Sequence, residues 1–320
     1  MSTTPAPASD LTANPARDLR SLGHTLPPDA ASFGWLREST DAADDPDQLR
    51  QRFDRDGYLF LRDFLDPDDV LAARRSVMER LMDRGLLRPG TDPMEGVVNP
   101  ETDAQDIPHA DLAVRCPPVR HVVFGERLCD FYARFFDEPI RHFDNIWLRA
   151  IAPGHGTACH CDWVYMSRGS RQLMTCWIPY GDIPLSVGGL LVLEDSFRRK
   201  DKLAGYLERD VDDYCQNKPG HLERLKKHEQ GWSFPGHLSR RPDLLPKQFG
   251  TRWLTAECFR PGDILTFRMD LVHGSLDNRS DRFRLSSDTR YQPASHPADR
   301  RWIGANPVGH GPDAKRGMIC

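Results

Sequence analysis

The segment T-A-C-H-C-D-W, residues 157–163, brings two thiols, one imidazole and one carboxylate to four consecutive positions. The segments on either side, 146–151 and 174–178, are rich in residues that favour strands and are bounded by turn residues. We therefore expect residues 159–166 to be extended as well. The kind of protein then depends on which of these four polar side chains can hold a metal ion.

In an extended chain, successive side chains point to opposite faces. His160 and Asp162 therefore share one face, whereas Cys159 and Cys161 share the other. A zinc site built on the two cysteines would need a second pair of thiols or imidazoles at short spacing, and none follows. The pair His160 and Asp162 alone would usually be a surface histidine beside a turn aspartate, so a metal site needs a third ligand.

A candidate third ligand lies near the end of the chain. His273 follows the apolar run 269–272 and precedes a glycine, which lets a ligand or another backbone approach closely. Two imidazoles and one carboxylate on one side of a metal leave open positions, as in non-haem Fe(II) oxygenases. This donor set favours iron over structural zinc.

Arg284 stands eleven residues beyond His273. In an extended segment 283–291, alternation places Arg284, Ser286, Asp288 and Arg290 on one face. We expect a hairpin through the turn after His273 to bring Arg284 beside that histidine. An arginine on such a strand commonly faces solvent, but beside a metal its guanidinium could bind the far end of a dicarboxylate.

Taken together, the motifs resemble the phytanoyl-CoA dioxygenase family of Fe(II)/2-oxoglutarate-dependent oxygenases. The family pattern is similar to H-C-D at 160–162, H-G-S at 273–275 and Arg284. F-D-R-D-G-Y-L-F-L-R-D-F-L at 53–65 resembles its N-terminal helix and strand. C-W-I-P-Y-G-D-I-P-L-S-V-G-G-L-L-V-L at 176–193 resembles the strand pair after its metal motif. The segment E-D-S-F at 194–197 departs from the turn found in many relatives.

The resemblance implies an α+β, mainly β fold: a double-stranded β-helix, or jelly roll, flanked by N-terminal helices. It implies iron bound by His160, Asp162 and His273, and 2-oxoglutarate bound by Arg284 with help from Ser275. Trp177 occupies the place of a tryptophan that lines the cosubstrate pocket in the family, although a strand tryptophan is as often a core residue.

The implied reaction consumes O2 and 2-oxoglutarate and hydroxylates a small molecule, as in a biosynthetic tailoring step. Demethylation, desaturation and ring formation would use the same ligands. Retention of Asp162 favours hydroxylation over halogenation, because related halogenases have a small residue there. Two alternatives are a zinc- or manganese-dependent hydrolase or isomerase with the same triad, and a non-catalytic jelly-roll binding module.

The composition sets further limits on function. A formal net charge of −4 provides no general attraction for nucleic acid or a membrane surface, and no segment reaches the roughly 18 apolar residues of a membrane span. Eight cysteines without regular spacing are typical of reduced thiols in a cytoplasmic protein. The oligomeric state has no signal in the sequence.

The chain divides into a mobile arm, 1–30, rich in Pro, Ala, Ser and Thr, and a single domain, 31–320. Helices are predicted near 47–56, 67–84 and 119–136. The charged segment 197–250 interrupts two strands that should be neighbours, and we expect it to form a lid over the substrate. Candidate substrate contacts are Trp232, Phe234 and Arg290.

Overall fold

The computed structural model describes residues 18–102, 112–113, 116–213 and 236–310. Its larger sheet consists of β4 (Tyr58–Leu61), β5 (Ile140–His142), β6 (Trp147–Ile151), β7 (Met174–Pro179), β12 (Ile264–Arg268) and β14 (Arg284–Pro293). The strand order is β4-β12-β7-β14-β5, with β6 pairing along the other half of β14. All of these pairs are antiparallel.

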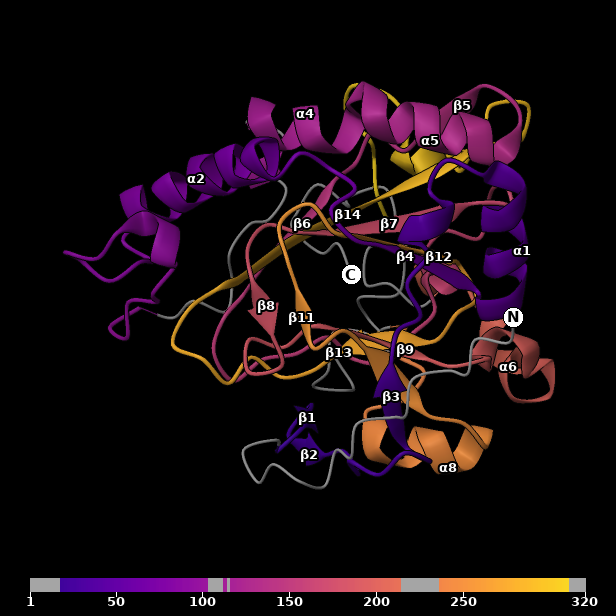
Figure 1. Ribbon diagram of the computed structural model, residues 1–320, viewed down its shortest axis with the longest axis horizontal. Coiled ribbons are helices and arrows are strands. Elements are labelled where there is room, and N and C mark those ends of the chain that lie inside the picture. Colours follow the sequence, from indigo (N-terminus) through magenta and orange to yellow (C-terminus); the bar gives the residue numbers. More distant parts are fainter. Residues whose placement is uncertain (1–17, 103–111, 114–115, 214–235, 311–320) are drawn as a thin grey trace.

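The smaller sheet has the order β13-β9-β10-β3. Its strands are β3 (Phe33–Trp35), β9 (Leu190–Leu193), β10 (Trp253–Thr255) and β13 (His273–Ser275). A short pair, β8 (Ile183–Pro184) with β11 (Cys258–Phe259), lies beside it. The two sheets form a mainly β jelly roll (Figure 1), which confirms the predicted fold class.

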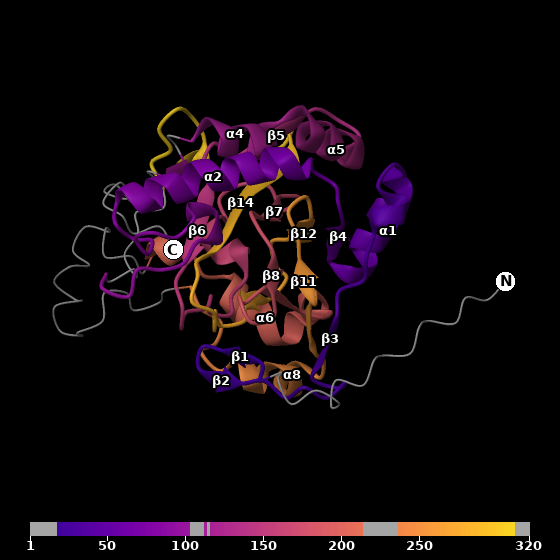
Figure 2. The same ribbon diagram turned by 60° about the vertical axis from the view of Figure 1, so that its left-hand side comes forward.

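Helices cover the outside of the larger sheet, as Figure 2 shows for α2, α4 and α5. The N-terminal helices are α1 (Pro46–Asp56), α2 (Pro67–Asp83), α4 (Pro117–Phe124) and α5 (Glu126–Phe136). Asp45 and Asp66 cap α1 and α2, and a proline follows each cap at the first helical position. No helix in the described ranges is long and apolar enough to cross a membrane.

The helix predicted near 119–136 is two helices. They meet at Gly125, whose extended backbone, φ −67° and ψ 159°, cannot continue α4. Periodicity alone did not reveal this break, because the apolar positions on both sides of the glycine face the same core.

Strand β7 shows how the two faces of the larger sheet differ. Met174, Cys176 and Ile178 point outward into the core beneath the helices. The alternate residues Thr175 and Trp177 point inward and line a cavity between the sheets. Residues of both sheets also share one inner apolar cluster, including Tyr58, Phe60, Leu190, Val192, Leu254 and Leu265. The interior between the sheets is therefore partly core and partly cavity.

The long insertion joins two strands that are neighbours, as the sequence predicts. β9 and β10 pair antiparallel, with Leu193 opposite Trp253. Within the insertion, α6 (Lys200–Leu207) and α8 (Leu245–Phe249) pack on the outer face of the smaller sheet through Leu203 and Phe249. The described part is thus chiefly an outer layer on that sheet, and within it His237 lines a cavity next to the one between the sheets.

The boundary of the predicted N-terminal arm needs correction. Residues 18–30 are not a free arm, because β1 (Arg20–Ser21) and β2 (His24–Thr25) form a short hairpin that packs on the domain. Leu19 and Leu26 are buried, and the Ser21 hydroxyl donates to the backbone carbonyl of Ser275. Residues 1–17 lie outside the described residues.

Candidate metal centre and cosubstrate pocket

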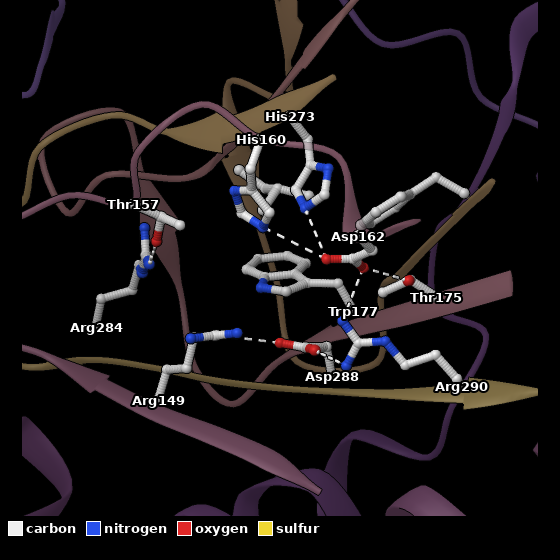
Figure 3. Close-up of a pocket in the computed structure, with 12 residues that line it drawn as sticks. Arg149, Thr157, His160, Asp162, Thr175, Trp177, His273, Arg284, Asp288 and Arg290 are labelled. Atoms are coloured by element: carbon white, nitrogen blue, oxygen red, sulfur yellow. Dashed lines mark hydrogen bonds and ion pairs between the residues drawn. The ribbon is translucent and has the colours of Figure 1, made fainter. Parts of the chain in front are cut away.

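Backbone pairing brings the two candidate histidine ligands together. His160 and His273 exchange both backbone hydrogen bonds, each with an N···O distance of 2.9 Å. Asp162 begins a short 3₁₀ helix, Asp162–Tyr165, where the sequence predicts a strand. One ligand atom from each of the three side chains nevertheless lies within 4.8 Å of the others, and all three are buried (Figure 3).

Both imidazoles present the same nitrogen to the centre of this cluster. Nδ1 of His160 lies 2.7 Å from the Ala158 carbonyl, and Nδ1 of His273 lies 3.0 Å from the Leu271 carbonyl. A carbonyl only accepts, so each Nδ1 is the donor and each Nε2 is left as the ligand atom. Burial, and next the neighbouring His160, lower the pKa of His273 to about 4, so this ring is neutral near pH 7. The donors fit an Fe(II) ion.

Two side chains hold the Asp162 carboxylate in place. Its Oδ2 accepts from Arg290 Nη2 at 2.7 Å and from Thr175 Oγ1 at 2.6 Å. Burial alone would raise the pKa of this carboxyl, but the Arg290 guanidinium and then the two imidazoles hold the pKa well below its usual range. Oδ1 lies 3.4 Å from Nε2 of His160 and 3.6 Å from Nε2 of His273. One oxygen is thus engaged by protein donors, while the other faces the metal site.

Thr175→Val is expected to weaken Fe(II) binding about tenfold, because loss of a partner that orients a metal ligand typically costs 10- to 100-fold in affinity. The change removes the hydroxyl that binds Asp162 Oδ2 without altering the charge of the site. Anaerobic titration of Fe(II) against a competing chelator measures the affinity. Thr175→Ser should retain it, and equal affinity in the Val and Ser variants would contradict this role.

Arg284 is a buried cation without an anionic partner in the described part of the chain. It is 1% exposed, and its Nη1 donates to the Gly188 carbonyl while Nη2 lies 3.5 Å from Thr157 Oγ1. Its Nε has no hydrogen-bond partner among the described residues. Burial, followed by repulsion from Arg149, lowers the pKa of Arg284 to about 9. A carboxylate arriving at this position would satisfy the guanidinium.

The triad and Arg284 line one cavity between the two sheets (Figure 3). Trp177 also lines it, and its ring packs edge-on against Phe259. The other lining residues include Arg149, Thr157, Leu190, Phe267, Asp288 and Arg290. A second cavity shares His160, Asp162 and Arg149 with the first and extends toward His237.

The structure bears on three further sequence expectations at the site. Arg284 does not return beside His273 on a hairpin, because β13 pairs with β9 in the smaller sheet whereas β14 belongs to the larger one. The Ser275 hydroxyl accepts from the Thr157 amide at 2.8 Å and is not among the residues that line the cavity. Arg290 is engaged by Asp162 and Asp288, so it positions a metal ligand; it also lines both cavities, and its contact with a substrate stays a prediction.

Trp232 and Phe234, the other predicted substrate contacts, lie outside the described residues. The alternation predicted for 283–291 is confirmed, since Arg284, Asp288 and Arg290 line the cavity while Leu285 and Tyr291 lie in the core beneath the helices.

Three residues of the site were not predicted from the sequence. Thr175 on β7 and Arg149 on β6 both face the cavity, and alternation along these two predicted strands could have placed them there. His237 joins the site from the insertion: the Leu238 amide donates to the Cys159 carbonyl at 2.8 Å. No local pattern indicates a contact of that kind.

The two cysteines of the motif take no part in the site, as the alternation argument predicts. Cys159 and Cys161 are fully buried in the apolar cluster outside the smaller sheet. Burial raises the pKa of the Cys159 thiol to about 12 and that of Cys161 well above its usual value. Both remain protonated thiols near neutral pH, which are poor metal ligands.

Two imidazoles and one carboxylate share a cavity with a buried arginine that has no anionic partner among the described residues. Together they define the centre of a non-haem iron oxygenase that uses a dicarboxylate cosubstrate. The phytanoyl-CoA dioxygenase (PhyH) family model matches residues 53–286, so the chain belongs to this family. It is an Fe(II)/2-oxoglutarate-dependent oxygenase.

The chain is similar to two proteins named 1-deoxypentalenic acid 11-beta-hydroxylase. It is 25% identical to the one from Streptomyces arenae, over 82% of this chain and 87% of the relative. Identity to the one from Streptomyces exfoliatus is 27%, over 81% of this chain and 85% of the relative. Hydroxylases are therefore among its relatives.

Solved structures share the fold. The non-haem carbocyclase SnoK of nogalamycin biosynthesis superposes with a TM-score of 0.54 at 18% identity, covering 82% of this chain and 90% of that one. EctD from S. alaskensis superposes with a TM-score of 0.51 at 16% identity, covering 90% of each chain.

Proposed function

We propose that His160, Asp162 and His273 bind Fe(II) and that Arg284 binds the far carboxylate of 2-oxoglutarate. The observation that carries this assignment is the buried guanidinium of Arg284, which lines the same cavity as the triad and has no anionic partner among the described residues. Leaving such a cation without a counterion is costly, and a cosubstrate carboxylate removes that cost through paired charge-assisted hydrogen bonds. Trp177 forms part of the same wall.

When bound, iron and 2-oxoglutarate supply the oxidation of a C–H bond by O2, with succinate and CO2 as coproducts. The chain's own residues hold and orient these groups. Arg290 and Thr175 fix Asp162 so that Oδ1 faces the metal site, and the Asp162 carboxylate fills the position that a halide would need. Hydroxylation is the reaction that this arrangement supports best.

We propose a small-molecule substrate in a biosynthetic tailoring step, in line with relatives that hydroxylate 1-deoxypentalenic acid. We also propose that residues 31–320 form a single domain. Within this domain, the segment 197–250 helps to enclose the substrate, a role supported by His237, which lines the second cavity. A cytoplasmic location is supported by the described cysteines, all of which are free thiols.

Anaerobic mixing of the protein with Fe(II) and 2-oxoglutarate tests the assignment. We expect a weak visible charge-transfer band, because the keto acid chelates the metal, and succinate should form after O2 is admitted. Glutarate is the matched control, since it has both carboxylates but lacks the keto oxygen and should give no band. A folded protein that gives neither band nor succinate would contradict the proposed function.

A further inference from the structure

The cavities beside the triad hold more cations than anions. Within the described residues, three guanidinium groups and two carboxylates line them: Arg149, Arg284, Arg290, Asp162 and Asp288. Among these five side chains, one positive charge is in excess. Fe(II) brings two positive charges and the 2-oxoglutarate dianion brings two negative ones, so the excess persists in the loaded site. Because a cation that is largely buried is costly without a counterion, a further anion is expected there.

Arg149 is the cation that lacks a full partner. Arg290 is paired with both Asp162 and Asp288, and Arg284 is assigned to the cosubstrate. Arg149 donates only its Nε, to Asp288 Oδ2 at 3.1 Å, while Asp288 Oδ1 is already bound by Arg290. No described residue accepts a hydrogen bond from either terminal nitrogen of Arg149. These two nitrogens can together bind both oxygens of a carboxylate.

The position of Arg149 makes its two terminal nitrogens available to a ligand in the second cavity. Arg149 lines both cavities, whereas Arg284 lines only the first. The second cavity has an apolar wall formed by Trp147, Ala158, Tyr165 and Met166. His237 also faces it, with a buried Nδ1 that has no partner among the described residues. An apolar surface thus lies beside one cation with unused donors, Arg149, and one unmet hydrogen-bonding group, His237 Nδ1.

We propose that the primary substrate is a small monocarboxylate with an apolar body, whose carboxylate binds Arg149 and whose body lies against Trp147 and Met166. This inference rests on the proposed function, since His160 and Asp162 line the same cavity and the oxidised carbon must lie near them. The rigid guanidinium fork matches a carboxylate with two parallel hydrogen bonds. His237 provides a place for one further polar group of the substrate.

The test uses the anaerobic protein loaded with Fe(II) and 2-oxoglutarate, whose charge-transfer band responds when a molecule enters beside the metal. The probes are cyclohexanecarboxylic acid, 1-naphthoic acid and dehydroabietic acid, each compared with its methyl ester. We expect at least one acid to shift the band and to bind at least about tenfold more tightly than its ester, which lacks the charge.

Arg149→Gln should weaken binding of that acid about tenfold or more, leave binding of its methyl ester unchanged and change the 2-oxoglutarate affinity by a much smaller factor. Arg149→Lys should restore part of the preference for the acid. Arg141→Gln, a change at an exposed arginine on β5, is the matched control and should alter neither probe.

Three results would overturn the inference: no acid binds, an ester binds as tightly as its acid, or Arg149→Gln lowers the affinity for 2-oxoglutarate instead. The last result would assign Arg149 to the cosubstrate. Failure of the proposed function itself is distinguishable, because the charge-transfer band would then be missing before any probe is added.

Discussion

Replacing His160 or His273 by alanine is expected to abolish stoichiometric Fe(II) binding and turnover of 2-oxoglutarate. Each change removes one of three ligand atoms that lie within 4.8 Å of one another. The loss of affinity should exceed the roughly 100-fold that removal of an outer partner can cost. Iron per protein after anaerobic loading and desalting, together with succinate release, measures the effect.

The controls are Cys159→Ala and Cys161→Ala, which remove the neighbouring thiols without placing a hydroxyl in an apolar cluster. Both variants should still bind one iron per chain. If either lost its iron while circular dichroism showed an intact fold, the thiols would have to be ligands and the triad assignment would be wrong.

Arg284→Met should weaken 2-oxoglutarate binding by about two to three orders of magnitude and leave Fe(II) binding intact. Removing one partner of a buried ion pair costs about 3 to 5 kcal/mol, because the remaining charge is left uncompensated. The affinity can be read from the charge-transfer band during a titration with 2-oxoglutarate. The iron affinity, measured without cosubstrate, serves as the internal control.

Pyruvate sharpens this test, because it keeps the chelating keto acid and lacks the far carboxylate. The unmodified protein should prefer 2-oxoglutarate to pyruvate strongly, and Arg284→Met should lose most of that preference. An undiminished preference in the variant would mean that another group binds the far carboxylate and that Arg284 has a structural role.

The metal ligands could be predicted because the motifs that contain them are short and local in the sequence. The H-C-D motif and the H-G-S segment each place ligand types beside strand boundaries, and one antiparallel bridge joins the two histidines. Alternation along an assumed strand chose His160 and Asp162 over the cysteines correctly, although Asp162 actually begins a 3₁₀ helix. Because the preceding residue, Cys161, is extended, His160 and Asp162 still share one face.

The relation between His273 and Arg284 could not be derived in the same way. Eleven residues are enough for a hairpin, but in a jelly roll consecutive strands commonly belong to opposite sheets, as β13 and β14 do. The hydrogen-bond partners of Asp162 could not be predicted from the sequence either. Thr175 and Arg290 are 13 and 128 residues from it in the chain, so only the folded sheet reveals their contacts.

Strand β14 carries Arg284 near one end and Arg290 six positions further on, with Asp288 between them and all three directed into the interior. Side chains on a strand alternate, so a shift of its pairing by a single position would turn all three outward together. Insertions and deletions within 284–290 should therefore be excluded by selection even where single substitutions are tolerated. Natural variation in the length of this protein is expected instead in the connections between strands.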